Sequence, residues 1–194
     1  MFNRISLRAL AIIAALLSAC AQLPKTPVAD SPGRPAQALT QWHMKGKVGI
    51  TTLTERVNAS INWQQQESDF SISLSGPFGQ GRADLIGDAS GIVLATGGQT
   101  YRGTSAKDLM QQQLGWSVPV QHFTYWAKGI PSPLAPVTGL SYDEQGSLSA
   151  LEQDGWQVSL SRYTTVDGWQ LPGRMSAKTD QIALLVVAKE WLLD

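Results

Sequence analysis

The stretch Trp42-His43-Met44-Lys45-Gly46-Lys47-Val48-Gly49-Ile50 decides the fold class, because apolar and polar side chains alternate along most of it. Successive side chains of a β-strand point to opposite faces of a sheet, so this alternation predicts a half-buried strand. The same pattern returns at 57–63 and at 70–74. Three such strands at short spacing predict an antiparallel meander.

Strand patterns continue to the end of the chain. Asp154-Gly155 and Asp167-Gly168 are typical of the turns that join two antiparallel strands. The last segment is apolar on both faces as far as Ala188, which favours a strand covered on each side; a terminal helix is the alternative. Short strands are expected at 83–86, 92–95, 99–102, 148–151, 156–161, 169–171, 175–177 and 182–193.

The middle of the chain has the pattern of two helices. Ser105 is expected to cap the first, whose apolar residues recur at helical spacing until Gly115 ends it. The second is expected to start at Pro119 and to stop at Gly129, before Pro131. Around this helical insertion we expect about ten or eleven strands. The prediction is a mainly β fold, a curved antiparallel sheet that helices close on one side.

The N-terminus has the pattern of a lipoprotein signal peptide over residues 1–19. Arg4 and Arg8 precede an apolar run at 10–17, which is far shorter than the roughly 20 residues that span a bilayer. Small residues then lead to Cys20, the only cysteine, whose thiol is the nucleophile that diacylglyceryl transfer requires. We expect Cys20 to carry a covalent diacylglycerol and an N-acyl group. An ordinary secretory signal beside a chance cysteine is the alternative.

Residues 20–38 are expected to form a lipidated tether, and residues 39–194 the folded domain. The tether contains Pro24, Pro27, Pro32 and Pro35 among small and polar residues, without periodicity. Ala21 follows the cysteine, where an aspartate usually keeps a lipoprotein of a Gram-negative bacterium in the inner membrane. The absence of aspartate at this position favours the outer membrane, with the protein lipid-anchored on the periplasmic face.

Composition limits the function of the domain. Without residues 1–19 the chain has 13 basic and 15 acidic side chains, a balance that does not favour nucleic-acid binding. Only 15% of all residues are charged, while 43% are hydrophobic and seven are tryptophan. This apolar surplus fits either a large core or an internal apolar cavity.

The patterns of catalytic sites are missing, so no catalytic residue and no metal site are predicted. His43 and His122 are the only histidines, and neither has a motif around it. His43 is expected at the surface and His122 on the polar side of its helix. Gly76–Ala83 superficially resembles a phosphate loop but has Arg82-Ala83 in place of Lys-Ser or Lys-Thr, which argues against nucleotide binding. Asp143 and Glu144 are adjacent in a turn and do not form a glycosidase pair.

The loop Gly76, Pro77, Phe78, Gly79 places a large apolar side chain at the tip of a turn. A turn tip normally faces water. Phe78 is therefore expected either to fold back onto the core or to act as a wedge for a bilayer or a partner.

Several residues together resemble the LolB family of outer-membrane lipoprotein receptors, over nearly the whole span from Trp42 to Leu193. No single motif is specific, but their order and spacing are. The matching features are the lipidated start, Trp63-Gln64-Gln65, Gly76-Pro77-Phe78-Gly79, the stretch from Tyr101 to Trp126, Gly129 and Pro131, and Leu171-Pro172 with Met175.

The resemblance implies an incomplete antiparallel β-barrel, covered by helices, that encloses an apolar cavity. Such a protein accepts the acyl chains of lipoproteins from the soluble periplasmic carrier LolA and inserts them into the outer membrane, without catalysis or nucleotide. The family's membrane-insertion loop commonly carries a leucine, and by position this role falls on Phe78.

The predicted partners are a LolA-like carrier, the acyl chains of the cargo and the outer membrane, and the receptor is expected to act as a monomer without a cofactor. A structural or scaffolding lipoprotein with a solid core is the alternative. From the strand alternation and the helix stripe, the expected cavity walls are Trp42, Trp63, Phe70, Leu74, Trp126 and Trp156.

Overall fold

The computed structural model describes residues 34–79 and 81–193. The signal peptide, Cys20 and most of the proposed tether lie outside the described residues. The described residues form one compact unit. Within it, no helix of the described residues is both long enough and apolar enough to cross a membrane.

The strands of the described residues form one antiparallel sheet, and two α-helices interrupt their sequence. The strands are β1 (Gln41–Thr52), β2 (Arg56–Gln66), β3 (Asp69–Ser75), β4 (Ala83–Asp88), β5 (Gly91–Thr96), β6 (Gln99–Gly103), β7 (Val137–Tyr142), β8 (Leu148–Gln153), β9 (Trp156–Val166), β10 (Trp169–Lys178) and β11 (Ile182–Leu193). The helices are α2 (Ala106–Leu114) and α3 (Val120–Trp126), and short 3-10 turns occur at η1 (Ala36–Ala38) and η2 (Pro77–Gly79).

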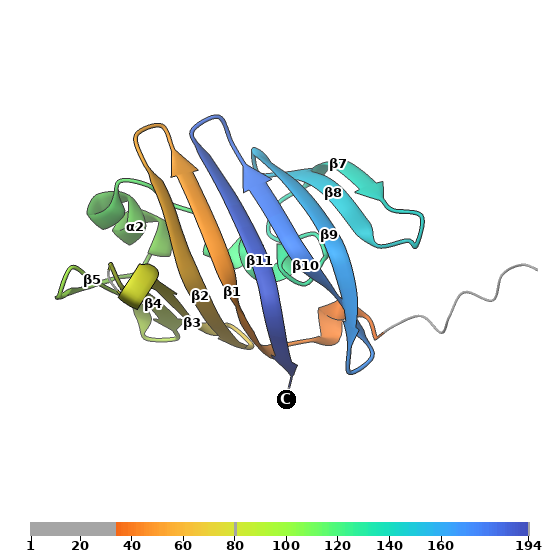
Figure 1. Cartoon of the computed structure of the whole chain (residues 1–194), viewed down its shortest axis with the longest axis horizontal. Coiled ribbons are helices and arrows are strands. Elements are labelled where there is room, and N and C mark those ends of the chain that lie inside the picture. Colours follow the sequence, from red (N-terminus) through yellow and green to blue (C-terminus); the bar gives the residue numbers. More distant parts are fainter. Residues whose placement is uncertain (1–33, 80, 194) are drawn as a thin grey trace, which may run out of the picture. The chain divides into compact units, whose positions relative to one another are not determined.

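The 11-stranded sheet runs in the order β6-β5-β4-β3-β2-β1-β11-β10-β9-β8-β7. Consecutive strands are neighbours except where β1 pairs with β11, which joins the N-terminal and C-terminal meanders. The sheet stays open, because β6 and β7 are its two edges. In Figure 1 the green segment that contains α3 lies behind the central strands, and α2 lies on the side of β4 and β5, so the helices cover one face. The predicted mainly β fold, an open antiparallel sheet covered by helices, is confirmed.

Glycine allows close backbone contact at two places that shape the sheet. At Gly46 the register between β1 and β11 shifts, and a Cβ atom there would lie 2.1 Å from the carbonyl oxygen of Val187. At Gly87 in β4 a Cβ would lie 2.3 Å from the ring of Phe70 in β3. Any larger residue at either position would push the neighbouring strand away.

Both helices form where capping residues predict them. The Ser105 side chain accepts a hydrogen bond from the Asp108 amide at 3.2 Å, and Gly115 ends α2 in the left-handed conformation. Helix α3 begins after Pro119 but ends at Trp126, one turn before Gly129.

The predicted number of strands agrees with the structure only because two errors cancel. Strand β7 was not expected, since its register shifts twice against β8, and two irregularities in six residues hide the alternation. Conversely, 169–171 and 175–177 are parts of one strand, β10, which continues through Pro172 and Gly173. Pro172 lies in the part of β10 that pairs only with β9, where a proline is tolerated. The terminal segment is strand β11 and not a helix.

The described end of the tether is attached to the domain. The Arg34 amide donates to the carbonyl oxygen of Gly168 at 2.9 Å, and its guanidinium lies 5.7 Å from the centre of the Trp169 ring. Residues 36–38 form the 3-10 turn η1. The described residues before Leu39, where the domain was expected to start, therefore pack against the domain.

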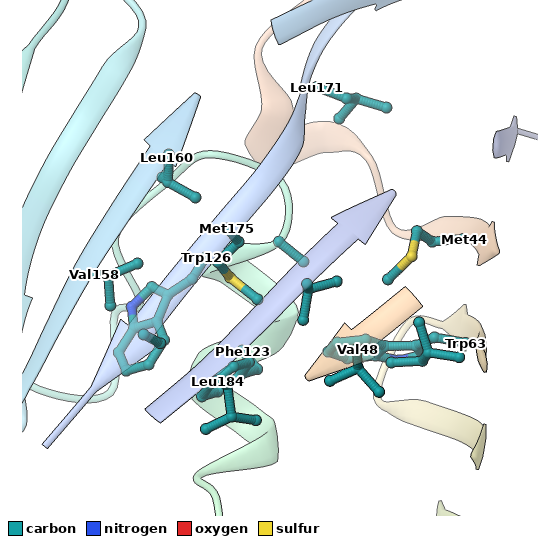
Figure 2. Close-up of a cluster of buried hydrophobic side chains, with 14 of the residues drawn as sticks. Met44, Val48, Trp63, Phe123, Trp126, Val158, Leu160, Leu171, Met175 and Leu184 are labelled. Atoms are coloured by element: carbon teal, nitrogen blue, oxygen red, sulfur yellow. The ribbon is translucent and has the colours of Figure 1, made fainter. Parts of the chain in front are cut away.

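The core consists of two hydrophobic clusters on the helix-covered face. The larger lies under the central strands and includes the residues labelled in Figure 2, with Phe123 and Trp126 of α3 opposite Leu184 and Met175 of the sheet. The smaller cluster lies between β4, β5 and the helices. It consists of Leu85, Leu94, Leu109, Met110 and Val120.

Candidate functional site

An apolar cavity of about 70 Å³ lies where the two hydrophobic clusters meet. The sheet contributes one wall, and helices α2 and α3 with their connection contribute the other. All the lining side chains are apolar apart from the indole N–H groups of two tryptophans. They are Val48, Ile50, Ile61, Trp63, Ile72, Leu74, Ala83, Leu85, Leu94, Met110, Leu114, Trp116, Val118, Val120, Phe123, Leu184 and Val186.

Two of the six expected wall residues, Trp63 and Leu74, line this cavity. The other four pack outside its lining. Trp42 lies behind Trp63, with their ring centres 5.0 Å apart. Trp126 and Trp156 pack in the larger cluster, at 6.3 Å from each other, and Phe70 lies against Gly87. Alternation identified the core-facing side chains but not which part of the core is hollow.

Sequence reasoning assigned none of the lining residues of the helical wall to the cavity, and it missed most of those on the sheet as well. Met110 and Leu114 come from α2, and Trp116 and Val118 come from the connection to α3. The shared apolar face of Leu109, Met110 and Leu114 was a signal for burial. No local pattern in the connection indicated that Trp116 turns inward.

Helix α3 is attached to the rest of the core by three side-chain hydrogen bonds. The Trp126 indole donates to the Gln153 side-chain oxygen at 2.8 Å, and the Thr124 hydroxyl donates to the Gln65 side-chain oxygen at 3.4 Å. The Lys128 ammonium, just after the helix, donates to the Leu39 carbonyl oxygen at 2.8 Å. Burial lowers the pKa of Lys128, because the surrounding groups disfavour its charged form.

Helix α2 is held differently. It contacts the edge strands β5 and β6, and it packs through Leu109 and Met110. Its side-chain hydrogen bonds among the described residues stay within the helix and its caps. The Ser105 hydroxyl accepts from the Asp108 amide, and the Gln111 side chain donates to the carbonyl oxygen of Gly115. The wall formed by α2 therefore depends on apolar contacts, which tolerate sliding better than directional hydrogen bonds do.

The loop between β3 and β4 presents Phe78 to solvent. The Phe78 side chain is fully exposed, whereas exposed phenylalanine is unusual in a folded domain. This excludes the alternative in which Phe78 folds back onto the core. The Gly79 amide donates to the Gly76 carbonyl oxygen at 3.1 Å and closes the turn.

Phe78 also has an unusual backbone conformation. Its φ of 58° and ψ of 21° place it in the left-handed region, at the turn position after Pro77 where glycine is usual. A bulky residue there is strained by about 1–2 kcal/mol. An aromatic side chain that is both strained and exposed contributes nothing to stability, and such residues are typical of functional sites.

The base of the loop is held by a polar cluster. The Arg82 guanidinium donates to both carboxylate oxygens of Asp84, at 2.7 and 3.0 Å, and the Ser73 hydroxyl donates to the same carboxylate at 2.5 Å. The hydrogen bond from Arg82 holds the pKa of Asp84 below its ordinary value. Strands β3 and β4 are thereby joined beneath the exposed loop.

Neither histidine lies in a catalytic arrangement. His43 is half-buried at the surface, and its ring interacts with the side chain of Asn62. His122 is mostly buried against Trp126, and its Nε2 lies 3.5 Å from an Asp154 carboxylate oxygen. Among the described residues, no group of three or more His, Cys, Asp and Glu side chains is placed to bind a metal ion.

The sequence was compared with those of known protein families and proteins. A family model described as "Outer membrane lipoprotein LolB" matches residues 40–191. The outer-membrane lipoprotein LolB of Cellvibrio japonicus is 34% identical over 100% of this chain and 98% of its own. The protein of that name from Pseudomonas syringae is 35% identical over 91% of each chain, and the one from Marinomonas is 35% identical over 96% and 98%.

A solved structure is similar as well. A LolA superfamily protein from Nitrosomonas europaea matches with a TM-score of 0.49 and 7% identity, over 86% of this chain and 90% of that one.

Proposed function

Because the chain belongs to the LolB family of outer-membrane lipoproteins, we propose that it receives the acyl chains of lipoproteins from a LolA-like periplasmic carrier and inserts them into the outer membrane. The observation that carries this proposal is the apolar cavity between the sheet and the helices. An acyl chain in water is unfavourable by about 0.8 kcal/mol for each exposed methylene. It therefore has to pass between apolar sites, and the cavity is one such site.

The cavity has to enlarge to take an acyl chain. At about 70 Å³ it has room for a few water-sized molecules. We propose that α2 is the wall that moves, because its contacts are apolar, and that α3 stays in place through its hydrogen bonds to Gln153, Gln65 and Leu39. The free energy gained by burying the acyl chain then offsets the free energy lost when α2 gives up its apolar contacts.

Delivery requires contact with a bilayer, and Phe78 is our candidate for that contact. Burying a phenylalanine side chain that is fully exposed in water is favourable by about 1.5–3 kcal/mol. The strained turn holds the ring away from the sheet, where it reaches lipid first. The commoner leucine of the family is smaller, but the apolar bulk is kept.

The lipid on Cys20 is the proposed anchor, on the periplasmic face of the outer membrane. The anchor and its tether keep the acyl-binding domain near the bilayer that receives the cargo. No step of this transfer makes or breaks a covalent bond, so the proposal requires neither a catalytic residue nor a cofactor.

Uptake of a fluorescent fatty acid tests the proposed function. The mature chain with Cys20→Ser should bind the fatty acid saturably, with the probe in an apolar environment. A scaffolding lipoprotein with a solid core would show no saturable uptake, and that result would overturn the proposal. Delivery is measured separately, as transfer of a labelled lipoprotein from the carrier, through the lipidated protein, to outer-membrane vesicles.

A further inference from the structure

An uncovered apolar strip lies along the β7 edge of the sheet. Its four side chains are Leu134, Val137, Leu140 and Tyr142, with 55%, 38%, 46% and 59% of their surfaces exposed. They account for half of the eight large hydrophobic side chains that are exposed among the described residues. We call these four residues the edge strip.

The two register shifts of β7 place three of these side chains on one face. Val137 pairs with Gln153, Leu140 with Leu151 and Tyr142 with Leu148, and all three partners on β8 are buried. The edge strip therefore continues the core-facing surface of β8. It remains exposed because the covering helices lie over other strands; α2, for example, contacts β5 and β6.

The backbone of β7 also has a free edge. Strand β7 is the last strand of the sheet and pairs with β8 alone. Its sequence, Val137-Thr138-Gly139-Leu140-Ser141-Tyr142, contains none of the lysine or proline residues that commonly protect edge strands from pairing. An extended segment of another protein has both hydrogen-bonding groups and apolar surface available here.

The chain segment that contains the edge strip carries acidic side chains only. From Gly129 to Ser161 the chain contains four acidic residues and no Lys, Arg or His. Asp143 and Glu144 follow the Tyr142 end of the strip, and Asp154 lies beyond its Val137 end, next to Gln153, whereas Glu152 pairs with Gly139 in the middle of β7. His122 approaches Asp154 from helix α3, at 3.5 Å. Acidic groups thus border the apolar surface at both ends.

This charge pattern decides between the possible occupants. A second copy would bring four more acids against these four, and like charges opposite one another are destabilising. The anionic surface of a bilayer is disfavoured for the same reason. The pattern fits a protein segment that is extended, apolar in its middle and basic at its ends.

We propose that the edge strip is the docking site of the acyl-chain carrier, which adds such a segment to β7. This inference rests on the proposed function for the identity of the partner. The location suits a transfer, because the Phe78 loop joins β3 to β4 and several strands separate it from β7. In Figure 1 the yellow turn η2 and the strand β7 lie in opposite halves of the sheet, at the left and the right of the view. A docked carrier therefore leaves Phe78 free to reach lipid.

The test measures binding of the cargo-free LolA-like carrier from the same organism to the mature chain with Cys20→Ser. Leu140→Ser with Tyr142→Ser should weaken binding about tenfold or more, because Leu140 lies in the middle of the strip and Tyr142 is its most exposed side chain. Glu144→Lys should weaken binding as well, and higher salt should weaken wild-type binding. Leu53→Ser removes a side chain that is 80% exposed in the β1–β2 turn, and this control should bind like wild type.

Hydrogen exchange provides a second readout that needs no variant. Backbone amides of residues 137–142 should become protected when the carrier binds, because strand addition pairs them. Unchanged exchange in β7, wild-type affinity of the double Ser variant, or no binding by the wild type would each overturn the docking site. Uptake of a fluorescent fatty acid by the same variants should remain unchanged. If the wild type took up no fatty acid, that result would instead refute the proposed function, independently of carrier binding.

Discussion

The indole N–H of Trp126 donates a 2.8 Å hydrogen bond to the side-chain oxygen of Gln153, and both side chains are buried. This bond joins helix α3 to strand β8. The same oxygen accepts from the Ser132 amide at 3.0 Å, and the Gln153 side-chain amide donates to the carbonyl oxygens of Ser132 and Ala135 at 2.7 and 2.6 Å. One glutamine therefore holds the helix, the following loop and the sheet together.

Gln153→Leu should lower the free energy of unfolding by about 3–5 kcal/mol. The substitution leaves the buried Trp126 N–H and the groups of the 132–135 loop without partners, and each such group costs about 1–3 kcal/mol. Urea denaturation measures the change. Gln157→Leu, an exposed position in β9, is the matched control and should change stability by less than about 0.5 kcal/mol. Equal losses for both variants would show that the buried network contributes little.

Phe78→Gly should abolish delivery to membranes without reducing stability. Glycine adopts the left-handed conformation of residue 78 without strain, and the exposed ring has no contacts in the core to lose. The two measurements are thermal unfolding and transfer of a labelled lipoprotein to vesicles. Phe78→Leu should retain delivery because it keeps an apolar side chain, while Phe78→Glu should fail. Normal delivery by the glutamate variant would refute the wedge role of Phe78.

Ala83→Phe should reduce the uptake of acyl chains by filling the cavity. Ala83 lies on its wall, and the larger ring occupies space that the chain would otherwise use. Uptake of a fluorescent fatty acid should fall at least about tenfold, which corresponds to 1.4 kcal/mol of binding free energy. The control is Ala95→Phe, since Ala95 pairs with Asp84 on the neighbouring strand and does not line the cavity. Unchanged affinity in Ala83→Phe would place the acyl site elsewhere.

Lys128→Met should alter how stability depends on pH. Because burial lowers the pKa of Lys128 in the folded protein, the unfolded chain binds a proton that the folded chain has released, up to the ordinary pKa of 10.5. The free energy of unfolding of the wild type should therefore rise, relative to the variant, as pH approaches 10.5. Urea denaturation at several pH values from neutrality upwards measures this difference. A difference that stays constant over this range would mean that Lys128 titrates normally.

Local patterns predicted most of the secondary structure. Alternation placed β1 to β6, β8, β9 and β11, and Ser105 with Gly115 placed both ends of α2. These signals are readable because a strand or a cap depends on neighbouring residues only. Strand β7 was missed and β10 was divided because bulges and an internal proline break the local pattern, although long-range pairing restores the strand.

The candidate site was predictable in part. The loop Gly76–Gly79 is conspicuous in the sequence, but whether Phe78 points outward follows only from its left-handed backbone and from the absence of nearby core. Trp63 and Leu74 line the cavity, whereas Trp126 and Trp156, which share the same alternation or helical stripe, do not. A pattern shows which face a side chain lies on and carries no information about what packs opposite it.

The sequence alone was therefore sufficient for the fold class, the helical insertion, the position of the exposed loop and the resemblance to the LolB family. The hollow between the two clusters, the Gln153 network and the edge strip arise only in three dimensions. Each of them depends on residues far apart in the chain, such as Trp126 and Gln153, that meet when eleven strands pair in one order. Local propensity does not encode such contacts, because they result from how whole elements pack.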